Sequence, residues 1–306
     1  MIVNANKLIP EKKHESFVLR VLSNAFARFV IYLATAILVL KSTEYFFEIF
    51  TPLQSFANSD VVDYFRETFI IILLFAIYYF LIRVIEKRPV YELSLSMIFT
   101  EILAGIICGS LIILLVVGIL AIPGYYSVVK FNSADALIHG FFSFVNGAFF
   151  EELLFRLIIF KLMEEYFGSW LSLLFSALIF GAAHLFNQNA TVWSAFAIAV
   201  EAGVLLTLAF MFTRRIWMAF GIHFGWNFFQ ASVFGLPASG LSFPGLITSE
   251  LSGPVWITGG NFGVEASPIT LVLGLILSFI LLKKVLKDDQ VILPSWHKRK
   301  RTEIKY

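Results

Sequence analysis

Three charged residues stand close together in an otherwise apolar stretch, Phe149-Phe-Glu-Glu-Leu-Leu-Phe-Arg156. A charge near the middle of a bilayer costs at least about 2.5 kcal/mol even on lenient insertion scales, so these side chains need partners, water or a chemical role. Helical geometry puts Glu152 and Arg156 four residues apart on one face, within reach of an ion pair. Glu151 is rotated about 100° away, lacks that partner and is a candidate general base. The alternative is a purely structural charge cluster that locks helices together.

Two later apolar runs also carry polar side chains. One ends in Phe180-Gly-Ala-Ala-His184, and the other holds His223 and Asn227 at i, i+4 spacing. Two polar groups on one stripe of an apolar helix point into a bundle rather than at lipid. Gly221 and Gly225 beside them would let another helix or a substrate backbone approach closely. Taken alone, the histidine near a helix end is more often a hydrogen-bonding residue than a catalytic one.

The composition indicates which elements must position these groups. The 306 residues are 59% hydrophobic and 14% charged, and their mean hydropathy is +0.84. A soluble globular domain has a charged share nearer a quarter, so the fold class is all-α, a polytopic helical membrane protein. The single cysteine, Cys108, excludes an intrachain disulfide. We find neither a nucleic-acid motif nor a phosphate-binding glycine loop, and we expect no nucleic-acid partner.

A membrane-spanning helix needs about 20 mostly apolar residues, and the sequence offers about eight such runs. They are Asn24–Leu40, Thr68–Val84, Met97–Ala121, Ala134–Phe160, Trp170–Phe186, Val192–Phe212, Ile216–Phe234 and Ile269–Leu282. Between the first two, the mixed segment Thr43–Glu67 predicts a helix lying on the membrane surface.

The placement of lysine and arginine predicts the topology, because cytoplasmic loops are enriched in both. An inside N-terminus puts most basic residues on the cytoplasmic side, and the long Gly235–Pro268 loop carries none of them. Both termini are therefore expected in the cytoplasm. We predict a single membrane domain over residues 1–306. Its parts are a cytoplasmic head (1–23), catalytic core helices (134–234), an extracytoplasmic Gly/Pro-rich loop (235–268) and a basic cytoplasmic tail (283–306).

Depth in the membrane gives a check that is independent of any motif. At a rise of 1.5 Å per residue, Glu151 lies about 20 Å from the expected cytoplasmic end of its helix, and His184 about 24 Å. His223 and Asn227 lie about 12 and 18 Å from that side. All four groups fall in the middle layer, so they could share one site. Glu201 is a further candidate for lining it.

In this order, on three predicted helices, Glu151-Glu152-x-x-x-Arg156, Phe180-x-x-x-His184 and His223-x-x-x-Asn227 resemble the motifs of the CPBP family of intramembrane proteases. That family is also called the CAAX protease and bacteriocin-processing, or ABI, family, and it includes the Rce1-type prenyl-protein proteases. The resemblance extends over Ala134 to Phe234 and leaves the Gly235–Pro268 loop unexplained.

The resemblance implies a glutamic endopeptidase that hydrolyses peptide bonds within or at the edge of the membrane. Glu151 and His184 would polarise a water for attack on a peptide carbonyl. His223 and Asn227 would donate hydrogen bonds to the oxyanion of the tetrahedral intermediate, which agrees with the chemistry of an imidazole and an amide. Phe180, which belongs to the second motif, would line the site.

The remaining implications concern support and partners. Glu152 and Arg156 would hold the site structurally. The substrate would be a peptide or membrane protein, either with a CAAX-like prenyl tail or as a precursor peptide, in contact with the lipid bilayer. No cofactor or metal is expected. The protein would be an integral, multi-pass protein of the plasma membrane of a prokaryote.

Three alternatives stay open. Glutamate with two histidines could bind zinc and leave a water position open, although no His-Glu-x-x-His helix strengthens that case. A proton-coupled transporter could use the buried Glu and His groups as a relay, although no matching halves are apparent. A non-catalytic membrane binding or immunity protein would use the same pocket without turnover.

Overall fold

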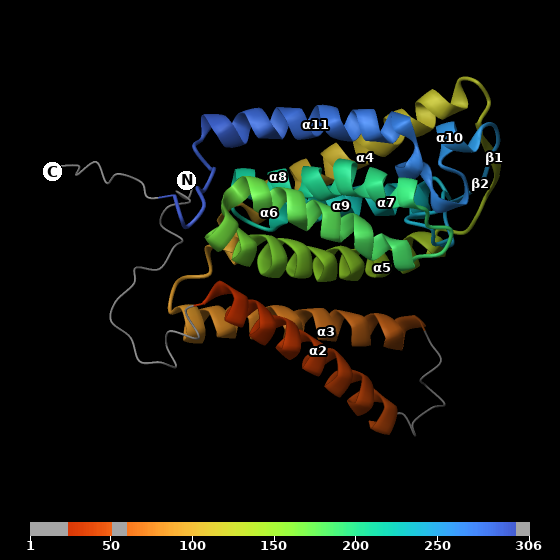
Figure 1. Ribbon diagram of the computed structural model, residues 1–306. Coiled ribbons are helices and arrows are strands. Elements are labelled where there is room, and N and C mark those ends of the chain that lie inside the picture. Colours follow the sequence, from red (N-terminus) through yellow and green to blue (C-terminus); the bar gives the residue numbers. More distant parts are fainter. Residues whose placement is uncertain (1–23, 51–59, 298–306) are drawn as a thin grey trace.

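Long helices dominate the computed structural model, which describes residues 24–50 and 60–297 (Figure 1). The α-helices are α2 (Ala25–Phe50), α3 (Asp60–Leu81), α4 (Ile98–Ala121), α5 (Asp135–Glu152), α6 (Lys161–Ala183), α7 (Val192–Ile198), α8 (Val204–Thr213), α9 (Trp217–Asn227), α10 (Val255–Thr258) and α11 (Pro268–Lys287). Wider π-helical stretches continue several of them, namely η3 (Ile82–Glu86), η6 (Leu153–Phe160), η8 (Ala199–Gly203) and η9 (Phe228–Val233).

Shorter elements connect the helices. The 3-10 turns are η4 (Tyr91–Leu93), η5 (Leu95–Met97), η7 (His184–Phe186), η10 (Gly260–Phe262) and η11 (Val264–Ala266). Two strands, β1 (Tyr126–Phe131) and β2 (Ile247–Leu251), pair antiparallel at one end of the bundle, with an irregularity in register between Val128 and Lys130.

The helices confirm the predicted class of polytopic helical membrane protein. Six helical stretches are long and apolar enough to cross a bilayer. One of them, Asp135–Phe186, contains a turn at Gly168, whose φ of 74° suits glycine, so that α6 beyond this point runs back along α5 (Figure 1). With α9 and η9 added, the helical segments correspond in position to the eight predicted spans. The number of crossings and the membrane side of the termini remain predictions.

The predicted surface helix over Thr43–Glu67 is wrong. α2 continues to Phe50 and α3 already begins at Asp60, so both ends of that segment extend the flanking helices. The acids and aromatics there lowered the hydropathy without ending the helices, because neither glycine nor proline interrupts residues 43–50 or 60–67. Residues 51–59 lie outside the described part.

The two predicted terminal segments are described only in part. The head, residues 1–23, and residues 298–306 of the tail lie outside the described residues. Within the predicted tail, α11 remains helical to Lys287. Beyond it the chain packs back on α6, where the Ser169 backbone N–H donates to the Ile292 carbonyl at 2.9 Å. The first residues of α2 and the last of α11 lie at the same end of the bundle (Figure 1).

Two glycine pairs bring α4 and α9 into close contact. A Cβ added to Gly109 of α4 would lie 2.2 Å from the Ile222 carbonyl oxygen, and one added to Gly221 of α9 would lie 2.5 Å from the Ile102 carbonyl oxygen. Gly105 and Gly225 are equally close to the opposite backbone. The spacing of four residues within each pair is the small-residue pattern that lets membrane helices approach closely. This contact fixes the rotation of α9 and therefore the direction of its polar side chains.

We expect Gly109→Ala to destabilise the protein by about 1–3 kcal/mol, because the added methyl group forces the two backbones apart. The matched control is Gly118→Ala in the same helix, where an added Cβ meets nothing within 4 Å. That change should be neutral or stabilise the protein by up to about 1 kcal/mol, because alanine is the better helix former. Equilibrium unfolding in mixed micelles measures both, and equal stabilities for the two variants would contradict the close-contact interpretation.

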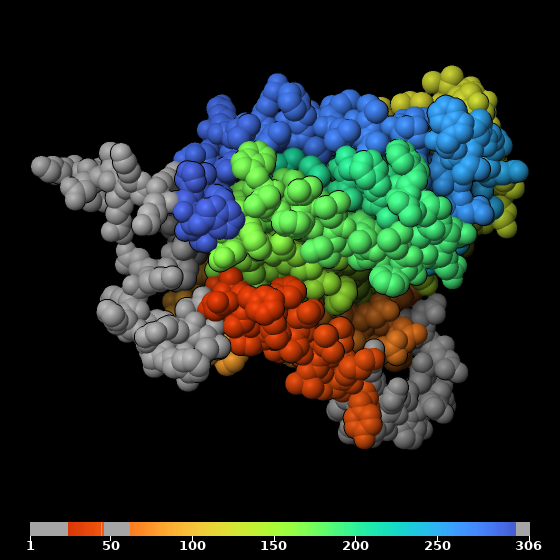
Figure 2. Space-filling view, in the orientation of Figure 1, coloured from red at the N-terminus to blue at the C-terminus, as the bar shows by residue number. Residues whose placement is uncertain are grey.

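Figure 2 shows how the outer elements enclose this core. The α2 helix covers the lower edge of the bundle, α11 covers the upper edge, and residues around β2 and α10 form the right-hand end. α2 contacts α3 and α6, and α3 contacts α5. The site described next is bordered by α6, η8, α8 and α9, and α5 contributes Glu151 and Glu152 beside it.

Candidate active site

The predicted ion pair of the first motif is confirmed. Glu152 Oε2 lies 3.1 Å from Arg156 Nε, and both side chains are fully buried. The pair spans the start of η6, so the helix widens directly after the two glutamates. Such π-helical stretches are frequent at functional sites. The charges of Glu152 and Arg156 therefore offset each other inside the bundle.

The ion pair with Glu152 leaves the hydrogen-bonding capacity of the Arg156 guanidinium largely unused. Its guanidinium carbon lies 4.7 Å from the centre of the Phe180 ring, a cation–π contact. None of its three guanidinium nitrogens has a hydrogen-bond partner within the described part of the chain. Phe180 thus links the first motif to the second, and its own ring packs edge-on against Phe155 at 4.8 Å.

His223 lies between the two glutamates. Its Nδ1 is 2.9 Å from Glu152 Oε1, a buried hydrogen bond, and its Nε2 is 3.8 Å from Glu151 Oε2. Glu151 remains 30% exposed at its side chain, whereas that of Glu152 is not exposed at all. The two carboxylates are therefore not equivalent: Glu152 orients the imidazole and Glu151 faces its other nitrogen.

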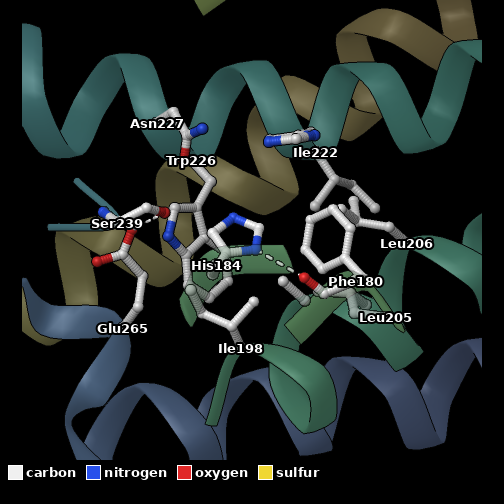
Figure 3. Close-up of a pocket in the computed structure, with 12 residues that line it drawn as sticks. Phe180, His184, Ile198, Leu205, Leu206, Ile222, Trp226, Asn227, Ser239 and Glu265 are labelled. Carbon is white, nitrogen blue, oxygen red and sulfur yellow. Dashed lines mark hydrogen bonds between the residues drawn. The ribbon is translucent and has the colours of Figure 1, made fainter. Parts of the chain in front are cut away.

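His184 begins the tight turn η7 that follows α6. Its Nδ1 lies 2.7 Å from the Phe180 carbonyl oxygen, so this nitrogen carries the proton and donates (Figure 3). The neutral ring then presents Nε2 as an acceptor. The hydrogen bond to the backbone fixes the ring at the end of the helix, where it borders a cavity.

The cavity collects three of the predicted residues. Figure 3 shows His184 and Asn227 at this cavity, which His223 also lines. The volume of the cavity is about 30 Å³. That volume holds two or three water molecules, since a single water needs about 10–15 Å³ on this measure. Apolar side chains form most of the remaining wall: Phe180, Ile198, Leu205, Leu206, Ile222 and Trp226. The site is therefore a small, largely apolar space with a few convergent polar groups.

Glu151 is not part of this wall. It reaches the site through His223, and the described residues include neither a hydrogen bond nor an ion pair between Glu151 and His184. Its Oε2 is buried and has no hydrogen-bond partner within the same part of the chain.

The other candidates separate into two cases. Phe180 lines the cavity. Glu201 does not, although its neighbour Ala202 does. Glu201 is fully buried on η8, and neither carboxylate oxygen has a hydrogen-bond partner among the described residues. Over the same residues, no group of three or more His, Cys, Asp or Glu side chains is placed to hold a metal ion.

Two wall residues were missed by the sequence interpretation. Ser239 and Glu265 come from the loop after η9 and face Asn227 and His184 across the cavity (Figure 3). Nothing in the sequence pattern of this loop indicated that it would fold back. An acid in a segment without any lysine or arginine was the one available signal.

Fold and site together define a polytopic helical membrane protein with a buried glutamate–histidine site at the meeting point of three helices. Residues 133–229 match the family described as Type II CAAX prenyl endopeptidase Rce1-like. The match covers about a third of the chain and supports the resemblance to the Rce1-like branch of the CPBP family, a family of membrane proteases. Comparisons with curated proteins and with solved structures give no match.

Proposed function

We propose that this protein is an intramembrane glutamic endopeptidase that cleaves peptide bonds of a membrane-associated substrate, either a CAAX-like prenyl tail or a precursor peptide. The observation that carries the proposal is the meeting of His184, His223 and Asn227 on one water-sized cavity, with Glu151 beside His223. An apolar pocket with a few convergent polar groups is the usual form of a catalytic site. The family match over residues 133–229 supports the same reaction class.

The proposed reaction needs no covalent intermediate. A water held between Glu151 and the acceptor nitrogen of His184 loses a proton to Glu151 as its oxygen attacks the substrate carbonyl carbon. The carbonyl oxygen becomes an oxyanion that accepts hydrogen bonds from His223 and Asn227. When the intermediate collapses, the C–N bond breaks and the proton passes from Glu151 to the leaving amine.

Glu152 has a defined part in this scheme. By accepting the Nδ1 proton of His223, it fixes the ring orientation and favours the doubly protonated imidazolium. An imidazolium carries a second N–H at Nε2, and that N–H is the donor an oxyanion requires. Arg156, whose Nε lies 3.1 Å from Glu152 Oε2, would hold this carboxylate in place beside the ring.

The test compares membranes of host cells that lack the protein with membranes of the same cells supplied with the wild type or Glu151→Gln. Terminal-peptide proteomics is expected to find new peptide ends with the wild type alone. The substrate so identified is then cleaved by purified protein in a strong chelator, where activity should persist. Identical termini in all three membranes would leave the binding or transport alternatives, and loss of activity with the chelator would favour zinc.

A further inference from the structure

The segment Gly235–Ser267 folds back over the cavity, and it lies beyond the matched residues 133–229. It supplies two wall residues, Ser239 and Glu265, whose side chains meet opposite Asn227 (Figure 3). Both lie on the side of the cavity that the three motif helices leave open. The wall of the site is therefore incomplete without this segment.

Glu265 is the centre of a buried hydrogen-bond cluster. Its Oε1 accepts from the Ser239 backbone N–H at 2.9 Å and from Ser239 Oγ at 3.3 Å. Its Oε2 accepts from Gln230 Nε2 at 2.7 Å. Glu265 is only 3% exposed, so each of these bonds is made away from solvent. One carboxylate thus joins η9, the 237–240 turn and η11.

The same cluster reaches both helices that carry candidate catalytic groups. Gln230 follows Asn227 by three residues, and its Oε1 accepts from Trp226 Nε1 at 3.0 Å. On the other side, Asn187, one turn after His184, donates from Nδ2 to the Ser239 carbonyl at 2.8 Å. A continuous chain of hydrogen bonds therefore runs from the end of α9 through Glu265 to the turn after α6.

The backbone around Gly263 is independent evidence that the segment packs tightly around Glu265. Its φ is 120°, and an added Cβ would lie 2.3 Å from the Pro237 carbonyl oxygen and 2.4 Å from Glu265 Oε2. A side chain at this position would thus force Glu265 and the 237–240 turn apart. The local backbone fits the closed contact because the residue is glycine.

We propose that Glu265 is a positioning residue that latches the Gly235–Ser267 segment over the cavity, joins it to the Asn227 and His184 helices, and must release for a peptide to enter. The role of this latch in substrate entry rests on the proposed protease function. The latched cavity, at about 30 Å³, holds two or three waters and no peptide. A peptide substrate therefore requires the wall to move, and the latch is the polar contact that holds this wall.

The latch is also expected to respond to pH. Burial raises the pKa of the Glu265 carboxyl from 4.5 to about 7, against its hydrogen bonds from Gln230 and Ser239. Around it lie Glu201 of η8, which interacts with it electrostatically, and the two cavity histidines, His184 and His223. The closed state binds the proton more tightly than an open, solvated carboxyl. The free energy that favours the closed state is therefore largest at low pH. It falls as the pH rises from 4.5 to about 7 and does not change further above that.

Cysteine accessibility tests the latch without relying on turnover. With the native Cys108 replaced by serine, Ala202→Cys places the single thiol on the cavity wall. Its reaction with a water-soluble maleimide is followed in the folded, purified protein. Each rate is normalised, at the same pH, to that of the unfolded chain.

Glu265→Ala is expected to speed labelling by about 10- to 100-fold, because it removes the carboxyl group that accepts hydrogen bonds from Ser239 and Gln230. Gly263→Ala should act in the same direction without a change of charge, and it provides the test if Glu265→Ala fails to fold. The control is Glu250→Ala, at an exposed acid in the same segment, which should leave the rate unchanged.

The pH profile separates a latch from a general loss of packing. Labelling of the wild-type background should accelerate between pH 5 and 7.5, and Glu265→Ala should remove that dependence. Unchanged labelling in Glu265→Ala, or a flat wild-type profile, would overturn the latch even if the protein proves to be a protease. Conversely, a protein that labels as predicted but cleaves nothing would leave the latch in place and contradict the proposed function.

Discussion

Replacing Glu151 with glutamine is expected to lower kcat by about 10²- to 10⁴-fold, the usual contribution of a general base. The amide keeps the shape of the side chain but cannot take a proton from water. The fold should survive, because Glu151 is 30% exposed at its side chain and its Oε2 has no hydrogen-bond partner in the described residues. Initial rates on an identified substrate, with circular dichroism of the same preparations, measure both effects.

His184→Ala should cause a loss of similar size, because the two residues are proposed to act on one water. The double variant Glu151→Gln/His184→Ala should then be hardly slower than either single variant, since residues that act as a unit are not additive. His139→Ala is the matched control, because His139 lies on the same helix as Glu151 and packs against Tyr64. Near-normal cleavage by either single variant would contradict the water-activating pair.

Local geometry explains which parts of the site could be predicted from the sequence. The ion pair between Glu152 and Arg156 depends on nothing but helical spacing, and it is present at 3.1 Å. The close approach at Gly221 also follows from a short-range pattern, although the sequence could not show that the partner is α4 rather than a substrate. The turn at Gly168 lies where the predicted fourth and fifth spans separate.

Contacts across long stretches of chain were beyond such patterns. The bond between His223 and Glu152 joins residues 71 apart and depends on how α9 is rotated against α4. Glu265 reaches the cavity through a loop with no hydrophobic periodicity, so neither depth nor spacing could place it. The wrong surface helix has a related cause: composition alone cannot distinguish a polar helix end from a helix lying on the membrane. Tertiary packing supplies what these local signals lack.

Removing the Glu152 carboxylate is expected to cost about 3–5 kcal/mol of folding stability, because it leaves Arg156 charged and unpaired in a fully buried site. Glu152→Ala should therefore lower the yield of folded protein as well as turnover. In contrast, Glu152→Met/Arg156→Met removes both charges and fills similar volumes, so it should recover most of the lost stability. Unfolding in mixed micelles gives the free energy for each variant and the coupling between the two sites.

The exposed pair Asp63–Arg66 is the control for this cycle. Its charged atoms lie 3.0 Å apart, about as close as those of the buried pair, but the two side chains are 51% and 41% exposed. Asp63→Ala should change stability by less than about 1 kcal/mol, because solvent screens the charge that remains.

Measuring turnover then separates the structural role of Glu152 from its role in orienting His223. The Met/Met variant should fold yet cleave poorly, because His223 has lost the carboxylate that orients it. A stable and fully active Met/Met variant would reduce Glu152 and Arg156 to packing residues, and normal stability of Glu152→Ala would contradict the buried pair itself.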